Sequence, residues 1–67
     1  MMTNMEKNIR VAMAQARIRS VAELAKRTCI PYTTLQRKMK RPEQMTVRDL
    51  QIISKDLHKP IAELLGE

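Results

Sequence analysis

Apolar residues recur at intervals of three and four along most of this 67-residue chain, which is the spacing of one face of an α-helix. Thr3 and Glu6 have the spacing of a capping box, so a first helix is predicted over residues 4–17. The apolar stripe of this helix consists of Met5, Ile9, Ala12, Met13 and Ala16.

Two shorter helices separated by a tight turn are predicted next. Ser20 and Glu23 repeat the capping-box spacing and open a second helix over residues 20–27. Pro31 suits the first turn of a helix, where its missing N–H is no loss, so a third helix is expected over residues 31–39. The positions of this pair that face inward are Val21, Leu24, Ala25, Thr28, Leu35 and Met39.

A loop and a fourth helix follow. Residues 40–45, which include Pro42, are expected to form the loop. Thr46 and Asp49 mark the N-terminus of a helix over residues 46–57. The predicted buried face of this helix consists of Val47, Leu50, Ile53 and Leu57.

A short fifth helix is predicted to begin at Pro60 and to stop at Gly66. Its apolar positions are Ile61, Leu64 and Leu65. The sequence contains no strand pattern and no repeat. We therefore expect a single all-α domain over residues 1–67, built as a compact five-helix bundle.

Size and composition argue against an enzyme. A chain this short buries only about 60% of the surface that its unfolded form exposes. It has no Phe and no Trp, so its core must be built from aliphatic residues and Met, and a deep cleft is hard to build from this material. His58 is the only histidine, and no partnered nucleophile or carboxylate lies near it in the sequence. We expect neither catalysis nor a small-molecule substrate.

The single cysteine, Cys29, excludes an internal disulfide and fits a reducing compartment. With one Cys and one His, none of the familiar metal-ligand sets can be assembled, and no cofactor is expected. The apolar runs are too short to span a membrane, and residues 1–10 lack the apolar region of a signal peptide. A cytoplasmic location is therefore expected.

The net charge of +6 favours a polyanionic partner. Between Leu24 and Pro42 there are six cations and no carboxylate, and this segment coincides with the predicted helix pair. An ordinary solvated surface is the alternative explanation. A short helix beside clustered positive charge nevertheless favours double-stranded DNA as the partner. The six cations are Lys26, Arg27, Arg37, Lys38, Lys40 and Arg41.

The run LAKRTCIPYTTLQRKM, residues 24–39, resembles the helix-turn-helix of the Cro/C1-type (xenobiotic-response-element) family, which comprises phage repressors and their bacterial relatives. Together with the apolar pattern of the last two helices, the resemblance covers about residues 4–66. It implies a lambda-repressor-like DNA-binding domain in which the second helix of the motif enters the major groove. The matching residues are Leu24, Ala25, Ile30, Thr33, Thr34 and Leu35.

Three residues depart from the family's pattern. Cys29 stands where the family usually has Gly in the turn, and a non-Gly residue costs about 1 kcal/mol in a left-handed conformation, unless the turn has another shape. Pro31 replaces the Ser or Thr that often caps the third helix. Met39 stands where a Glu often makes an ion pair to the first helix.

The resemblance implies that the first exposed positions of the third helix contact the bases. These are Tyr32 and Thr33, followed one turn later by Gln36 and Arg37. Arg37 can make a bidentate contact to guanine, Gln36 can pair with adenine, and the Thr33 methyl group can touch thymine. As alternatives, the Tyr32 ring shields the turn, and Gln36 is merely solvated.

Phosphate contacts position such a protein without reading sequence, and basic side chains are suited to them. Ser20, at the start of the second helix, offers its hydroxyl and free N–H groups to a phosphate, or serves only as the helix cap. The predicted phosphate-contacting residues are Arg19, Ser20, Lys38, Lys40 and Arg41.

One domain of this size offers a small contact area, so binding as a homodimer is expected, with half-sites about one helical turn apart. The family's habit places the dimer surface at the loop before the fourth helix and the start of the fifth. The predicted interface residues are Met45, His58, Lys59, Pro60 and Ile61.

Two functions remain open on this fold. The leading one is a sequence-specific DNA-binding transcriptional regulator, most similar to a small phage or prophage Cro-like repressor. The alternative is a protein-interaction module, such as an antitoxin or a polymerase-binding regulator. DNA binding that weakens steeply with salt would favour the first.

Overall fold

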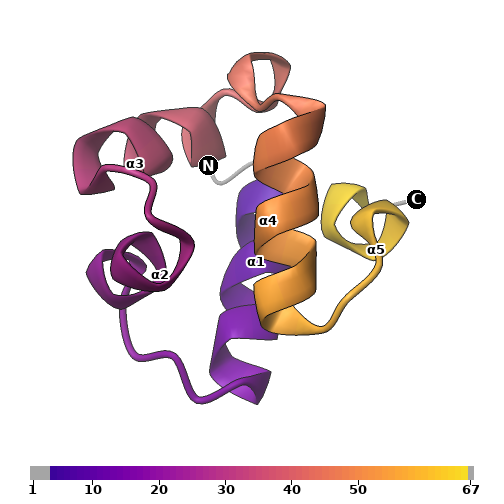
Figure 1. The fold of residues 1–67 in the computed structure, drawn as a ribbon. Helices are drawn as coiled ribbons and strands as arrows, with labels where there is room; N and C mark the ends of the chain where they lie inside the picture. Colours follow the sequence, from indigo (N-terminus) through magenta and orange to yellow (C-terminus); the bar gives the residue numbers. More distant parts are fainter. Residues whose placement is uncertain (1–3, 67) are drawn as a thin grey trace.

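A computed structural model describes residues 4–66, in which five α-helices pack around one apolar core (Figure 1). The predicted all-α, five-helix architecture is confirmed. The capping box predicted at Thr3 lies outside the described residues. The elements are α1 (Asn4–Gln15), α2 (Val21–Thr28), α3 (Tyr32–Lys40), the short 3-10 helix η1 (Pro42–Gln44), α4 (Val47–Leu57) and α5 (Ile61–Leu65).

Helix α1 ends at Gln15, two residues before its predicted end. The reason is a C-cap without glycine. Arg17 adopts the left-handed conformation with φ 61°, and the Ile18 N–H donates to the Met13 carbonyl at 2.8 Å, which is the closing bond of a Schellman motif. Ile18 is thereby buried in the core, a position that the sequence pattern had not indicated.

Helix α2 begins after Ser20, whose Oγ accepts a hydrogen bond from the Glu23 N–H at 3.2 Å, as the capping-box spacing predicted. The Glu23 carboxylate reaches one residue further back and accepts the Arg19 N–H at 2.7 Å. At the other end, Cys29 adopts the left-handed conformation with φ 60°, and the Ile30 N–H donates to the Ala25 carbonyl. The turn thus keeps the left-handed residue without the usual Gly.

Helix α3 starts one residue later than predicted, because Pro31 is its N-cap residue and lies outside the helix, with a φ of −54° and a ψ of 138°. The Pro31 carbonyl accepts the Leu35 N–H at 2.8 Å, but no side chain caps this helix. Met39, at the position where the family often has Glu, is buried. On α1, the buried Glu6 instead pairs with Arg10, one turn away, at 3.5 Å.

Helix α4 opens with the predicted capping box. The Thr46 Oγ1 accepts the Asp49 N–H at 3.0 Å, and the Asp49 carboxylate accepts the Thr46 N–H at 3.2 Å. His58 ends the helix in a left-handed conformation. Pro60 is the N-cap of α5 and not its first residue, while Gly66 ends α5 at φ 83°.

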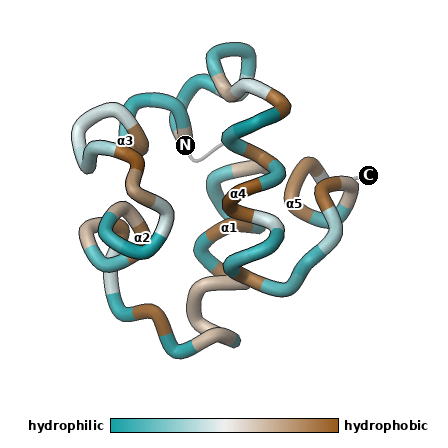
Figure 2. Tube along the Cα trace, in the orientation of Figure 1, coloured by the Kyte–Doolittle hydropathy of each residue, from teal (hydrophilic) through white to brown (hydrophobic). Residues whose placement is uncertain are grey.

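The core collects the inward faces of all five helices, and Figure 2 shows hydrophobic segments of α1, α4 and α5 alternating with hydrophilic ones. One predicted core position is wrong: Val47 is 68% exposed. Val47 is the first residue of α4 and lies at the edge of the apolar stripe of this helix, where the core does not cover its side chain. The residues predicted to be buried that are confirmed include Ile9, Leu24, Leu35, Met39, Ile53 and Leu64.

The left-handed Cys29 yields a stability prediction. Cys29→Gly should raise the free energy of unfolding by about 1 kcal/mol, because glycine adopts this conformation without the Cβ clash. Cys29→Ala is the matched control, since it removes the thiol but keeps the clash. Urea denaturation under reducing conditions measures both, and equal stabilisation by the two variants would contradict the strain.

Candidate nucleic-acid interface

Helix α3 is held by one face and open on the other. Leu35 and Met39 are 0% and 1% exposed, and α3 packs mainly on α2, with further contacts to α1 and η1. On the opposite face, Thr33 and Arg37 are exposed, and Tyr32 is 46% exposed. In Figure 1, α2 and α3 form one side of the molecule and α5 lies on the other. The motif therefore displays a polar helix face to solvent.

The four predicted base-contacting residues differ in their surroundings. Thr33 and Arg37 are exposed, whereas Gln36 is half-buried. Tyr32 borders a shallow groove between α2 and the turn, whose lining also includes Lys26 and Ile30. Tyr32 thus lies beside the turn, as the shielding alternative requires, and is still 46% exposed to solvent.

Lys38, a predicted phosphate contact, is engaged inside the protein. Its Nζ lies 2.7 Å from the Asp49 Oδ2, and the two side chains are 21% and 14% exposed. The positive charge of Lys38 is therefore largely neutralised by α4. The sequence could not indicate this pair, because it joins residues of two helices that pack little on each other.

Arg27 is paired in the same way. Its Nε and Nη2 donate to the two carboxylate oxygens of Asp56 on α4, at 2.9 and 3.2 Å. Two of the six clustered cations are thus matched by carboxylates that lie outside the acid-free segment of the sequence. Within residues 4–66, no ion pair involves the other four, which are all exposed: Lys26, Arg37, Lys40 and Arg41.

These pairs shift two pKa values. Desolvation by burial acts to raise the pKa of Asp49, but hydrogen bonds from Lys38 and Thr46, together with the Lys38 charge, outweigh it and hold the pKa below its ordinary value. The hydrogen bond and the charge of Asp56 raise the pKa of Arg27 above its ordinary value. Both shifts favour the charged forms that make the pairs.

The start of α2 already holds an anion of the protein itself. Ser20 is confirmed as the helix cap, and the Glu23 carboxylate lies at this N-terminus, bound to the Arg19 N–H. A phosphate approaching Ser20 would meet this negative charge. Arg19 and Ser20 are both exposed, and their contact to phosphate stays a prediction.

The structure separates the predicted dimer residues. Met45 is buried in the core of its own chain, at the N-terminal end of α4, and offers little side-chain surface to a partner. His58, Lys59, Pro60 and Ile61 lie together at the opposite end, about 16 Å away along the 11-residue helix. These four residues form one surface, and Met45 is not part of it because the length of α4 separates Met45 from them.

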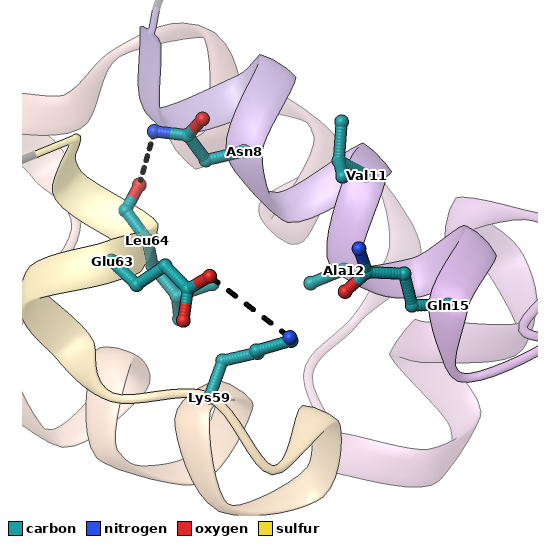
Figure 3. A pocket seen from close by; sticks show the side chains of 7 residues that line it. All are labelled: Asn8, Val11, Ala12, Gln15, Lys59, Glu63 and Leu64. Carbon is teal, nitrogen blue, oxygen red and sulfur yellow. Dashed lines mark hydrogen bonds and ion pairs between the residues drawn. The ribbon is translucent and has the colours of Figure 1, made fainter.

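A small pocket lies between α1 and α5 (Figure 3). Its volume is about 50 Å³, which suits a water molecule or two. The Asn8 Nδ2 of α1 donates to the Leu64 carbonyl of α5 at 3.5 Å, and on the α5 side of the pocket Lys59 pairs with Glu63 at 3.9 Å. Among residues 4–66 there is no metal-ligand cluster, and no helix there has the length and hydrophobicity to cross a membrane.

The lowered pKa of Asp49 predicts an acid-dependent loss of stability. The folded-state pKa lies below that of the unfolded chain, about 3.9, so the stabilisation by the carboxylate is complete above that pH and is lost as the pH falls through the folded-state pKa. The difference in unfolding free energy between the wild type and Asp49→Asn should therefore shrink below about pH 4.

Lys38→Met serves as the contrast in the same denaturation series. Removing the Lys38 hydrogen bond and charge raises the folded-state pKa of Asp49 toward that of the unfolded chain, so the acid-dependent loss of stability should be smaller in this variant. If the wild type and Asp49→Asn differed by a constant amount throughout the acid range, the pair would not stabilise the fold as described.

The sequence model of the Cro/C1-type HTH DNA-binding domain matches residues 8–66, which include most of α1 and all of α2 to α5. No curated protein and no solved structure matches the chain. The matched residues span more than half of the chain and contain the α2–α3 pair with its exposed polar face. The chain belongs to the Cro/C1-type helix-turn-helix DNA-binding domain family.

Proposed function

We propose that this protein is a sequence-specific transcriptional regulator that binds double-stranded DNA by inserting α3 into the major groove. The observation that carries the proposal is the two-sided character of α3. Leu35 and Met39 fix one face in the core. Thr33 and Arg37 on the other face are exposed, and Arg37 has no ion pair in the described part of the chain.

The exposed face carries side chains that can distinguish base pairs. The Arg37 guanidinium can donate two hydrogen bonds to the O6 and N7 of guanine. The Thr33 methyl can contact the methyl group of thymine, and Gln36 can pair with adenine where its half-buried amide reaches the groove. Tyr32, at the start of α3, adds a half-exposed ring beside the turn.

The cations next to α3 supply affinity. Lys40 and Arg41 follow the base-reading face directly, and Lys26 lines the same shallow groove as Tyr32. All three are exposed, so they can approach phosphates on either side of the major groove. Arg19 at the start of α2 can add a further contact. Lys38 contributes less, because Asp49 compensates its charge.

We further propose that the protein acts as a Cro-like repressor of phage or prophage type that occupies its operator as a homodimer. A nine-residue recognition helix covers only a few base pairs, and a second copy doubles the site read. The surface of His58, Lys59, Pro60 and Ile61 supports a contact between copies, since it lies away from α3 and contains exposed and half-buried side chains.

Selection of bound fragments from a random DNA pool tests the proposal. We expect the selected duplexes to contain two inverted half-sites whose centres are about 10 base pairs apart, or a multiple of that spacing.

The double variant with Tyr32→Ala and Arg37→Ala should then bind the selected duplex at least about tenfold more weakly than the wild type, as lost base contacts require. Gel-shift titration measures the affinity of the wild type and of the double variant.

Lys55→Ala is the matched control, because it removes one exposed cation from α4 and leaves α3 intact. It should change the affinity little. Recovery of no common sequence, or an unchanged affinity of the double variant, would contradict base reading by α3. A complex that is insensitive to salt would instead favour a protein-interaction module.

A further inference from the structure

Two carboxylates of α4 hold the two helices of the DNA-binding motif. Asp49 binds Lys38 of α3, and Asp56 binds Arg27 of α2. The two acids are seven residues apart, which is close to two helical turns, so they lie on the same face of α4 about 10 Å apart. One helix therefore pairs with each half of the motif through a separate ion pair.

Two hydrogen bonds hold the Asp49 carboxylate in place. The same Oδ2 that binds the Lys38 Nζ at 2.7 Å also accepts the Thr46 N–H at 3.2 Å, as part of the α4 capping box. Its side chain is only 14% exposed. Helix α3 packs mainly on α2, and this ion pair links it to α4 as well.

The Asp56 carboxylate has a defined direction as well. Arg27 donates to both of its oxygens, and such a bidentate pair fixes the guanidinium plane relative to the carboxylate. Pairs that are partly exposed to solvent contribute little to stability, typically below about 1 kcal/mol. These pairs therefore matter less for stability than for the orientation of α2 and α3 and for whether the charges of Arg27 and Lys38 are available to phosphates.

We propose that Asp49 and Asp56 are positioning residues that determine the specificity of DNA binding. This inference rests on the proposed function. Two ion pairs separated along α4 resist both sliding and rotation of the α2–α3 unit, so they fix the angle at which α3 meets the bases. They also hold Lys38 and Arg27 away from phosphates, which would otherwise add affinity for any sequence.

The test compares two duplexes of equal length and composition: one selected from the random pool and one with the same bases scrambled. The variants are Asp49→Asn and Asp56→Asn, which keep the size of the side chain. In the first of them the amide oxygen can still accept the Thr46 N–H, so the helix cap is retained. Binding constants are measured over a series of salt concentrations, at a temperature where circular dichroism shows the wild-type helix content in every variant.

We expect both variants to bind the scrambled duplex more tightly and with a steeper salt dependence, by about 0.9 in the logarithmic slope for each released cation that reaches a phosphate. The ratio of affinities for the selected and scrambled duplexes should fall at least about fivefold, the lower end of the effect of one lost base contact. Asp56→Glu keeps the negative charge, so this variant should retain the wild-type ratio of affinities for the two duplexes.

Glu63→Gln is the matched control. It makes the same change in net charge and releases Lys59 from an ion pair, but on α5, on the side of the molecule away from α2 and α3 (Figure 1). Because Lys59 belongs to the proposed contact between copies, analytical ultracentrifugation first establishes that this variant binds the duplex with the wild-type stoichiometry. Its affinity ratio should equal that of the wild type. A merely electrostatic effect of one added positive charge would lower the ratio in this variant too and would overturn the positioning role.

Two failures can be told apart. A wild-type protein that binds both duplexes equally well overturns the proposed function and this inference with it. Wild-type discrimination that persists unchanged in Asp49→Asn and Asp56→Asn overturns only the inference.

Discussion

The burial of Leu35 and Met39 is the constraint on which the presentation of α3 depends. These two side chains, one turn apart, fix one face of a nine-residue helix in the core. A helix this short would not be stable in isolation. Because the core holds only that face, the opposite face can remain polar and exposed, with Thr33 and Arg37 directed to solvent. The same packing thus makes the helix stable and leaves it able to enter a groove.

Some basic side chains of the chain are paired inside the protein, and others are available to a partner. Lys38 and Arg27 pair with carboxylates of α4, so they belong to the internal structure of the motif. Arg37, Lys40 and Arg41 are exposed and carry no ion pair in residues 4–66. A count of basic residues in the sequence therefore overstates what is available to phosphates, and the carboxylates of α4 make the difference.

Local signals in the sequence predicted most of the fold, and contacts between distant residues account for what it missed. The capping box of Thr46 and Asp49 depends on residues three apart, and it was predictable. The pairs Lys38–Asp49 and Arg27–Asp56 join residues 11 and 29 apart, so only the tertiary structure shows them. Periodicity also placed Val47 in the core, since it does not show how far the core covers the edge of an apolar stripe.

The most direct test of base reading by α3 is a titration of the isotope-labelled protein with a selected DNA duplex, followed by the chemical shifts of its backbone amides. We expect the largest changes at Tyr32, Thr33 and Arg37, smaller ones in α1, and a second group of changes only at residues 58–61, the proposed contact between copies. Changes concentrated in α1 and α5, with α3 unaffected, would contradict the account.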